Sequence, residues 1–295
     1  MIRAPFPAVR GENAPFSWSL RRRRMFDRCP REYFFHYLAA AGGADPFAPP
    51  EIRRLHRLRN MPDLPAFVNK LLTDSLRALF TGGAEDGEFF RAAVMERAAA
   101  AFADMISGRA DKDHKKPFLV ELTLPGAELP DLKRELFREL ETLIPQWTRG
   151  AVRELLAVPP ENRLDCPFPL KVHYGELDCY CTPAALWLER GLLNFAEAGV
   201  VEEETAALHC LHAMNTRNRA PGQVRTYAVT ESGLKQVEMP RSFSEALRRI
   251  RRDVERMTAA EGPGTLRYEE NFPSVPGEGC ARCRFRSVCS DAELP

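Results

Sequence analysis

Cys280-Ala-Arg-Cys283-Arg-Phe-Arg-Ser-Val-Cys289 is the stretch that says most about the fold of this 295-residue chain. Its three cysteines stand close together, with arginines between them and with prolines and glycines in the preceding residues 273–279. This pattern is typical of a ligand-bearing loop and not of a helix face. A four-thiolate metal centre that includes these three cysteines needs one further cysteine ligand. The best candidate is Cys29, which is followed by Pro30 and lies almost a whole chain away.

The spacing of the cysteines favours one kind of metal centre. Structural zinc sites usually have two Cys-x2-Cys halves, whereas this chain has one such half, a longer gap and a remote Cys-Pro pair. We therefore expect a [4Fe-4S] cluster on Cys29, Cys280, Cys283 and Cys289. Zinc is the alternative, and cysteines that bind no metal are the remaining interpretation. Four further cysteines lie in apolar runs and are expected to fill the core: Cys166, Cys179, Cys181 and Cys210.

The composition is that of an ordinary soluble globular protein, with 44% hydrophobic and 28% charged residues. The net charge of +1 says nothing by itself about nucleic acid, but arginines are concentrated at 21–24, at 248–252 and in the cysteine loop. The N-terminus has no apolar core of the signal-peptide type, and no run approaches the length of a membrane span. We expect a cytoplasmic protein without membrane contact, in a reducing compartment that favours metal ligation over disulfides.

Hydrophobic periodicity predicts helices through most of the first 160 residues. Ser17 and Ser19 can cap a first helix, and Pro30 begins the next. Further helices are expected at 51–60, 64–80, 86–107 and 130–156.

The pattern then changes to short β-compatible runs, which predict a meander. These runs cover 168–173, 175–181, 185–188 and 192–195. They are followed by a helix at 202–216, a hairpin of 223–230 and 234–238, and a basic amphipathic helix from Ser242 to about residue 260. We therefore expect an α/β fold in a single domain, 1–295. Its parts are an extended arm (1–16), a helical part (17–160), a sheet core (161–240), and a helix followed by the cysteine loop (241–295).

Two motifs give the chain a resemblance to a known family. They are Ser-Trp-Ser-Leu with Cys-Pro-x-x-Tyr-Phe-Phe-x-Tyr-Leu near the start, and Cys-x2-Cys-x-Phe-Arg-x-Val-Cys at 280–289. Together they resemble the iron–sulfur branch of the PD-(D/E)XK nucleases, which includes RecB/AddB-type exonuclease domains and CRISPR-adaptation nucleases. The resemblance implies a central mixed β-sheet flanked by helices, as in a restriction-endonuclease-like core. It also implies a [4Fe-4S] cluster on the four cysteines, and single-stranded or end-bearing DNA as ligand.

The catalytic positions of that family are altered in this chain. Such nucleases hold Mg²⁺ or Mn²⁺ with a helical His, an Asp, and an acid two residues before a Lys. Asp178 matches the first acid, but Asn194 stands at the second acid, Ala196 at the lysine and Thr73 at the histidine. The family's Gln-x3-Tyr is also absent from 205–212.

One remaining carboxylate should bind a hard divalent ion weakly, because such ions are held mainly by charged oxygens and water. We therefore expect a degenerate nuclease fold that has lost its chemistry. In a shifted strand register, other side chains would replace the missing ones. The candidate ligands are then Glu176, Glu189, Glu197 and Glu202, Glu203 or Glu204, with Lys171 or Arg190 as the cation.

The first helix carries the candidate contacts to nucleic acid. The arginines could bind phosphates and the tryptophan could stack on bases, as in proteins that bind single-stranded nucleic acid. The residues concerned are Arg21, Arg22, Arg23, Arg24 and Trp18. The alternative is a solvated helix face with salt bridges.

Three functions follow as hypotheses. The first is a catalytically inactive scaffold that binds DNA or a protein partner in DNA repair, recombination or phage defence, beside a nuclease, helicase or other defence effector. The second is an active Mg²⁺- or Mn²⁺-dependent DNA exonuclease or endonuclease with migrated active-site residues. The third is an iron–sulfur redox sensor.

Overall fold

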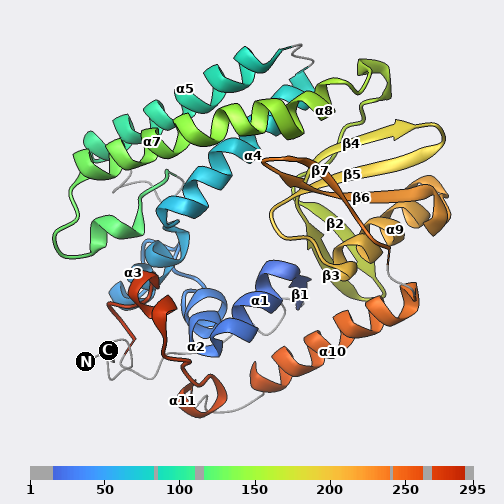
Figure 1. Ribbon diagram of the computed structural model, residues 1–295. Helices are drawn as coiled ribbons and strands as arrows, with labels where there is room; N and C mark the ends of the chain where they lie inside the picture. The colour runs from blue at the N-terminus through green and yellow to red at the C-terminus, as the bar shows by residue number, and fades with distance from the viewer. Residues whose placement is uncertain (1–15, 83–85, 110–115, 240–241, 262–267, 290–295) are drawn as a thin grey trace.

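Helices form most of the chain, and the strands lie between residues 170 and 237, apart from one short strand near the start (Figure 1). The computed structural model describes residues 16–82, 86–109, 116–239, 242–261 and 268–289. The α-helices are α1 (Leu20–Arg28), α2 (Pro30–Tyr33), α3 (Pro50–Asn60), α4 (Leu64–Gly82), α5 (Gly87–Ile106), α7 (Leu129–Trp147), α8 (Arg153–Leu156), α9 (Glu203–Arg217), α10 (Phe243–Glu261) and α11 (Tyr268–Asn271). Two π-helical turns, η1 (Phe34–Ala39) and η3 (Thr148–Val152), and 3-10 turns at Val120–Thr123, Pro160–Asn162, Pro221–Gln223 and Glu278–Arg282 complete the helical elements.

The predicted helices are confirmed within a few residues at most ends, with one interruption. Ser19 caps α1, since its Oγ accepts a hydrogen bond from the Arg22 backbone N–H at 3.2 Å. The helix predicted at 130–156 is broken at Gly150, where the backbone leaves the helical region (φ −93°, ψ −109°). A Cβ on Gly150 would lie 2.3 Å from the backbone oxygen of Glu231, so only glycine allows this close approach. The predicted extended arm lies largely outside the described residues.

The strands form two mixed sheets and not the single central sheet that was expected. The first has the order β1 (Ser17–Ser19), β3 (Leu177–Cys181), β2 (Leu170–Tyr174), with β1 parallel and β2 antiparallel to β3. The second has the order β4 (Pro183–Glu189), β5 (Leu192–Ala198), β6 (Val224–Thr230), β7 (Gly233–Val237). In it, β5 and β6 are parallel and joined by α9, and the other pairs are antiparallel.

The chain passes from one sheet to the other at Thr182 and Pro183. Proline has no N–H to donate to a strand ladder, and the pairing of β4 with β5 is irregular between Pro183 and Ala185. The predicted meander is thus confirmed as four strands, but its middle is bent between two sheets. Nothing in the alternation of residues 175–188 predicted this division.

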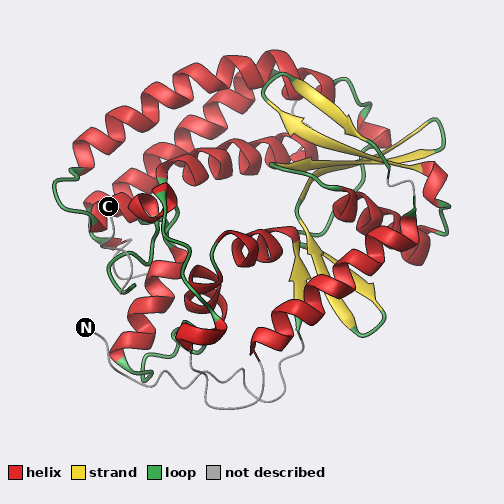
Figure 2. Cartoon of the chain, turned by 60° about the horizontal axis from the view of Figure 1, so that its bottom comes forward, coloured by secondary structure: helices red, strands yellow, loops and turns green. Residues whose placement is uncertain are grey.

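Two hydrophobic cores surround the sheets. Helices α4, α5 and α7 pack together over one face of the second sheet. Helix α9 packs on β6 of the second sheet and on β2 and β3 of the first, and α10 packs on α9. Figure 2 shows the strands gathered on one side of the molecule, with the other side built of helices. None of the helices in the described ranges is both long and apolar enough to cross a membrane.

Candidate metal centre

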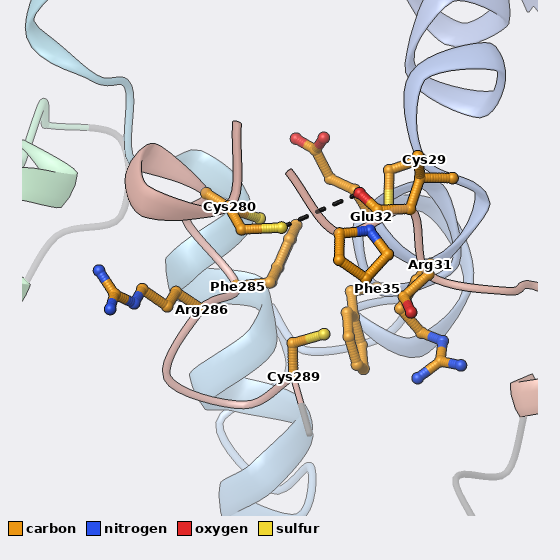
Figure 3. A pocket seen from close by; sticks show the side chains of 12 residues that line it. Cys29, Arg31, Glu32, Phe35, Cys280, Phe285, Arg286 and Cys289 are labelled. Carbon is orange, nitrogen blue, oxygen red and sulfur yellow. Dashed lines mark hydrogen bonds between the residues drawn. The ribbon is translucent and has the colours of Figure 1, made fainter. Parts of the chain in front are cut away.

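The four cysteines selected from the sequence line a single pocket (Figure 3). Cys29 comes from the junction of α1 and α2, whereas Cys280, Cys283 and Cys289 come from the C-terminal loop. Figure 3 shows the loop and the Cys29 segment on opposite sides of the pocket. Within the described part of the chain none of the four forms a disulfide, and all four are partly exposed. The structure therefore brings together thiols that are some 250 residues apart in the chain.

Cys29 is held by the two short helices that it separates. Its backbone is extended (φ −156°, ψ 103°), its N–H donates to the Met25 carbonyl at 3.0 Å, and its carbonyl accepts from the Tyr33 N–H at 3.1 Å. Pro30 then begins α2, which is possible because a helix's first turn needs no N–H donor there. Both backbone groups of Cys29 are thus occupied.

Two buried aromatic rings fasten the cysteine loop to η1 and α2. Phe285 is fully buried and lies against Phe35, with ring centroids 5.5 Å apart. Phe272, also fully buried, lies 5.2 Å from Phe34. The Arg31 Nε donates to the Phe272 carbonyl at 2.7 Å. The loop is therefore fixed by apolar burial as well as by hydrogen bonds.

Within the loop, backbone hydrogen bonds space the cysteines. The Cys283 N–H donates to the Cys280 carbonyl at 3.2 Å, and the Cys289 N–H donates to the Phe285 carbonyl at 3.0 Å. The Cys280 thiol itself lies 4.0 Å from the Val275 carbonyl. These turns keep the sulfurs around a shared pocket.

The pocket disfavours a free thiolate at Cys283. Burial, and then the nearby charges of Glu32, Cys29 and Cys289, raise the pKa of Cys283 to about 12. Glu32 is itself neutralised by Arg28, whose Nη2 lies 2.5 Å from its Oε2. Sequence reasoning missed Glu32, although its position three residues after Cys29 at the start of a helix was a usable signal.

The four cysteines present a set of four thiols at one pocket, with Phe35 and Phe285 among its apolar walls. Four cysteine thiolates are the ligand set of a [4Fe-4S] cluster and also of a structural zinc site. Among the described residues, no group of three or more His, Cys, Asp or Glu side chains that could hold a metal ion is found. Of the remaining cysteines, Cys179, Cys181 and Cys210 are buried and Cys166 is partly buried, as expected of core residues.

Asp178, the first candidate acid, lies in the first sheet, where it is partly buried and paired with two basic side chains. Its carboxylate lies 2.8 Å from the Lys171 Nζ and 2.9 Å from the His173 Nδ1, both on the neighbouring strand β2. The hydrogen bond from Lys171 is the main reason why the pKa of Asp178 is below its usual value. The structure does not bring Asp178 into the sheet that contains Asn194 and Ala196.

Asn194 and Ala196 lie on β5 of the second sheet and are enclosed by protein. Asn194 is 3% exposed, its Nδ2 donates to the Leu192 carbonyl, and its Oδ1 accepts from the Tyr227 hydroxyl at 3.5 Å. Ala196 is fully buried and pairs across the strands with Ala185. This face of the sheet packs into the core under α4 and α7. Within the described part of the chain, no group of three or more His, Cys, Asp or Glu side chains that could hold a metal ion is found there.

The other face of β5 carries a buried polar group. Glu197 accepts hydrogen bonds from the backbone N–H of Thr182 at 2.5 Å and from its hydroxyl at 2.8 Å. Its Oε2 lies 3.2 Å from the His209 Nε2, although these two atoms do not form a well-aligned hydrogen bond. The His209 Nδ1 lies 3.0 Å from the Thr226 hydroxyl. Glu197 therefore holds the bend between the sheets, with His209 of α9 beside it.

The α1 arginines are mostly engaged within the protein. Arg22 is buried and donates to the Tyr33 hydroxyl and to Glu261. Arg23 and Arg24 both pair with Glu202. Trp18 is 1% exposed and its Nε1 donates to Asp253 at 3.4 Å, so its ring offers no open face to a base.

Arg21 alone of these five residues is exposed and makes no salt bridge to a described carboxylate.

A scan against protein-family models finds no match for this chain, and neither does a search of curated proteins.

Proposed function

We propose that the chain is an iron–sulfur scaffold of PD-(D/E)XK-like design that has lost nuclease chemistry and binds DNA or a protein partner. The observation that carries this proposal is the shared pocket of Cys29, Cys280, Cys283 and Cys289. When bound there, a [4Fe-4S] cluster supplies a covalent cross-link between the two ends of the fold. The site of action we infer is DNA repair, recombination or phage defence, alongside a nuclease, helicase or other effector.

The surroundings of β5 support the proposed loss of nuclease activity. The positions that would carry an acid and a lysine are Asn194 and Ala196, both buried against the core. A substrate phosphate and a hydrated metal ion would have no access to them, and an alanine offers neither a proton donor nor a charge. Asp178 stands in the other sheet with Lys171 and His173 as partners.

The cluster is tested by iron content and absorption after anaerobic purification. We expect about four irons and four sulfides per chain in the wild type, from the cluster type itself. Cys29→Ser should lose the iron and the brown colour, because it removes the ligand that closes the site. Cys166→Ser, at a partly buried cysteine outside the pocket, is the matched control and should keep both. If the wild type contained stoichiometric zinc and no iron, the four cysteines would form a zinc site and not an iron–sulfur cluster.

The inactive scaffold is tested on native gels with end-labelled single-stranded and duplex DNA, with and without Mn²⁺. A shifted, intact band is the expected result. Cleavage that needs Mn²⁺ would overturn the loss of chemistry, and its disappearance in Asp178→Ala would place the surviving acid in the first sheet. Neither a shift nor cleavage would leave the protein partner as the ligand, to be identified among co-purifying proteins.

A further inference from the structure

A buried carboxylate lies in the pocket of the four cysteines. Glu32 of α2 follows Cys29 by three residues, and both side chains line the pocket. Among the described residues that line it, Glu32 is the only one with a carboxylate. Figure 3 shows the Glu32 side chain between the Cys29 segment and the loop that carries Cys280. A negative charge therefore lies where four thiolates would hold a metal centre.

Arg28 balances the charge of Glu32 in number but not in position. Its Nε and Nη2 lie 3.1 Å and 2.5 Å from the Glu32 Oε2. The Arg28 side chain is 65% exposed, whereas that of Glu32 is 8% exposed. Water screens the exposed guanidinium, but the carboxylate lines a pocket with apolar walls of Phe35 and Phe285. The field of Glu32 inside the pocket is therefore stronger than the opposing field of Arg28.

Two arginines also line the pocket and act in the opposite direction to Glu32. Arg31 is buried, and its Nε donates to the Phe272 carbonyl at 2.7 Å. Arg286 belongs to the cysteine loop and is exposed. Their positive charges favour uptake of an electron in the pocket, and the charge of Glu32 disfavours it. Replacing Glu32 alone therefore measures its own effect, because both arginines stay in place.

We propose that Glu32 lowers the reduction potential of the cluster and so favours its oxidised state. This role of Glu32 rests on the proposed function, because it requires the [4Fe-4S] cluster. One-electron reduction adds a negative charge to a centre with four thiolates, and a nearby carboxylate makes that step less favourable. The net charge and the apolar surroundings are among the factors that set such potentials. A cluster held in one oxidation state serves as a cross-link and not as an electron carrier.

The test is a redox titration of the anaerobically purified protein with titanium(III) citrate, which supplies one electron and is oxidised to titanium(IV). Electron paramagnetic resonance measures the reduced cluster. Glu32→Gln keeps the shape of the side chain and removes its charge. At a fixed potential we expect its ratio of reduced to oxidised cluster to be about ten times that of the wild type. For a one-electron couple this equals a midpoint about 59 mV higher.

Two further variants separate charge from packing. Glu135→Gln, at an exposed position of α7 outside the pocket lining, is the control and should keep the wild-type midpoint. Arg28→Gln removes the positive partner, so its midpoint should fall. The fall should be smaller than the rise in Glu32→Gln, because the Arg28 side chain is largely exposed. A looser pocket would move both midpoints in the same direction, whereas an effect of charge moves them in opposite directions.

The outcomes distinguish the role of Glu32 from the presence of the cluster. If all variants hold the full iron content and share one midpoint, the role of Glu32 is overturned while the cluster stands. The same conclusion follows if Glu32→Gln and Arg28→Gln shift in the same direction, or if Glu32→Gln resists reduction as fully as the wild type. If the wild type contains no iron, the proposed cluster and the role of Glu32 both fail.

Discussion

His36 is a neutral side chain in a cationic environment, and its protonation links the fold to pH. Burial lowers its pKa most, followed by the charges of four arginines: Arg21, Arg284, Arg59 and Arg22. All four keep their charge throughout the range in which histidine titrates. A proton on His36 would add a fifth positive charge in a buried place, which is why the folded protein resists it.

The free energy of unfolding should therefore fall as the pH drops below about 6.5. In the unfolded chain His36 takes up a proton near 6.5, but in the folded chain only near 2, so the unfolded state binds more protons between these values. Between pH 7 and pH 5 the loss from this residue is about 2 kcal/mol. Urea titrations in phosphate-free buffer measure it, as the difference between wild type and His36→Gln. Equal losses in both proteins would show that His36 titrates normally.

The charges at this scale could be predicted from the sequence, but their partners could not. The sequence shows a run of arginines at 21–24, but it does not show whether these arginines contact DNA or acidic side chains of the protein. Arg22 reaches Glu261, and Arg23 and Arg24 reach Glu202, through contacts between residues about 180 to 240 positions apart. Local periodicity contains no information about such contacts. His36 was missed because its neighbours Phe35 and Tyr37 made the segment resemble ordinary core.

At the scale of elements, the cysteine loop depends on one ring. Phe285 is fully buried between Phe35 and His36, in the middle of the segment that carries Cys283 and Cys289. The loop has only one short 3-10 turn of its own, so burial of this ring supplies much of its order.

Phe285→Ala should loosen the loop and lower both stability and iron content. Removing a buried phenylalanine side chain costs about 3–5 kcal/mol, and the flanking cysteines would lose their positions. Iron per chain and the midpoint of thermal unfolding measure the two effects. Phe47→Ala is the matched control, because Phe47 is 93% exposed and should change neither. Full iron content in a destabilised Phe285→Ala protein would show that the cysteines hold the loop without the ring.

Most elements could be predicted because their periodicity is local. The helices at 51–60, 64–80 and 202–216 and the hairpin around Gly233 agree with the structure. The departures have tertiary causes. Gly150 breaks its helix because the turn at Glu231 approaches it, and the strand path bends at Pro183, where Glu197 binds Thr182 from another strand. Strand β1 was missed because it is three residues long and forms only by pairing with β3.

At the scale of the whole molecule, a cluster bound by the four cysteines would close a loop of about 250 residues between Cys29 and Cys280. Cross-linking a loop of that length raises the free energy of the unfolded chain by roughly 5 kcal/mol, an upper value taken from disulfides. The expected cluster would therefore stabilise the entire fold, including the helices and sheets that touch neither Cys29 nor the C-terminal loop.

Removing the cluster by oxidation and chelation should lower the melting temperature by on the order of 10 °C. Hydrogen exchange should show lost protection in α1 and α2 as well as in the loop at 280–289. Cys29→Ser should start from the lower melting temperature and respond little to the same treatment. Loss of protection confined to the loop would mean that the two ends are held together by packing alone.

The separation of the pocket's two halves also sets an order of events during synthesis. Cys29 leaves the ribosome about 250 residues before Cys280, which at 5–20 residues per second is roughly 10 to 50 s. Throughout that interval its neighbours Phe34 and Phe35 lack Phe272 and Phe285, the rings that cover them. The nascent chain thus carries an unfinished aromatic surface beside a free thiol until its last segment arrives, and a chaperone or a cluster-delivery protein would meet it in that state.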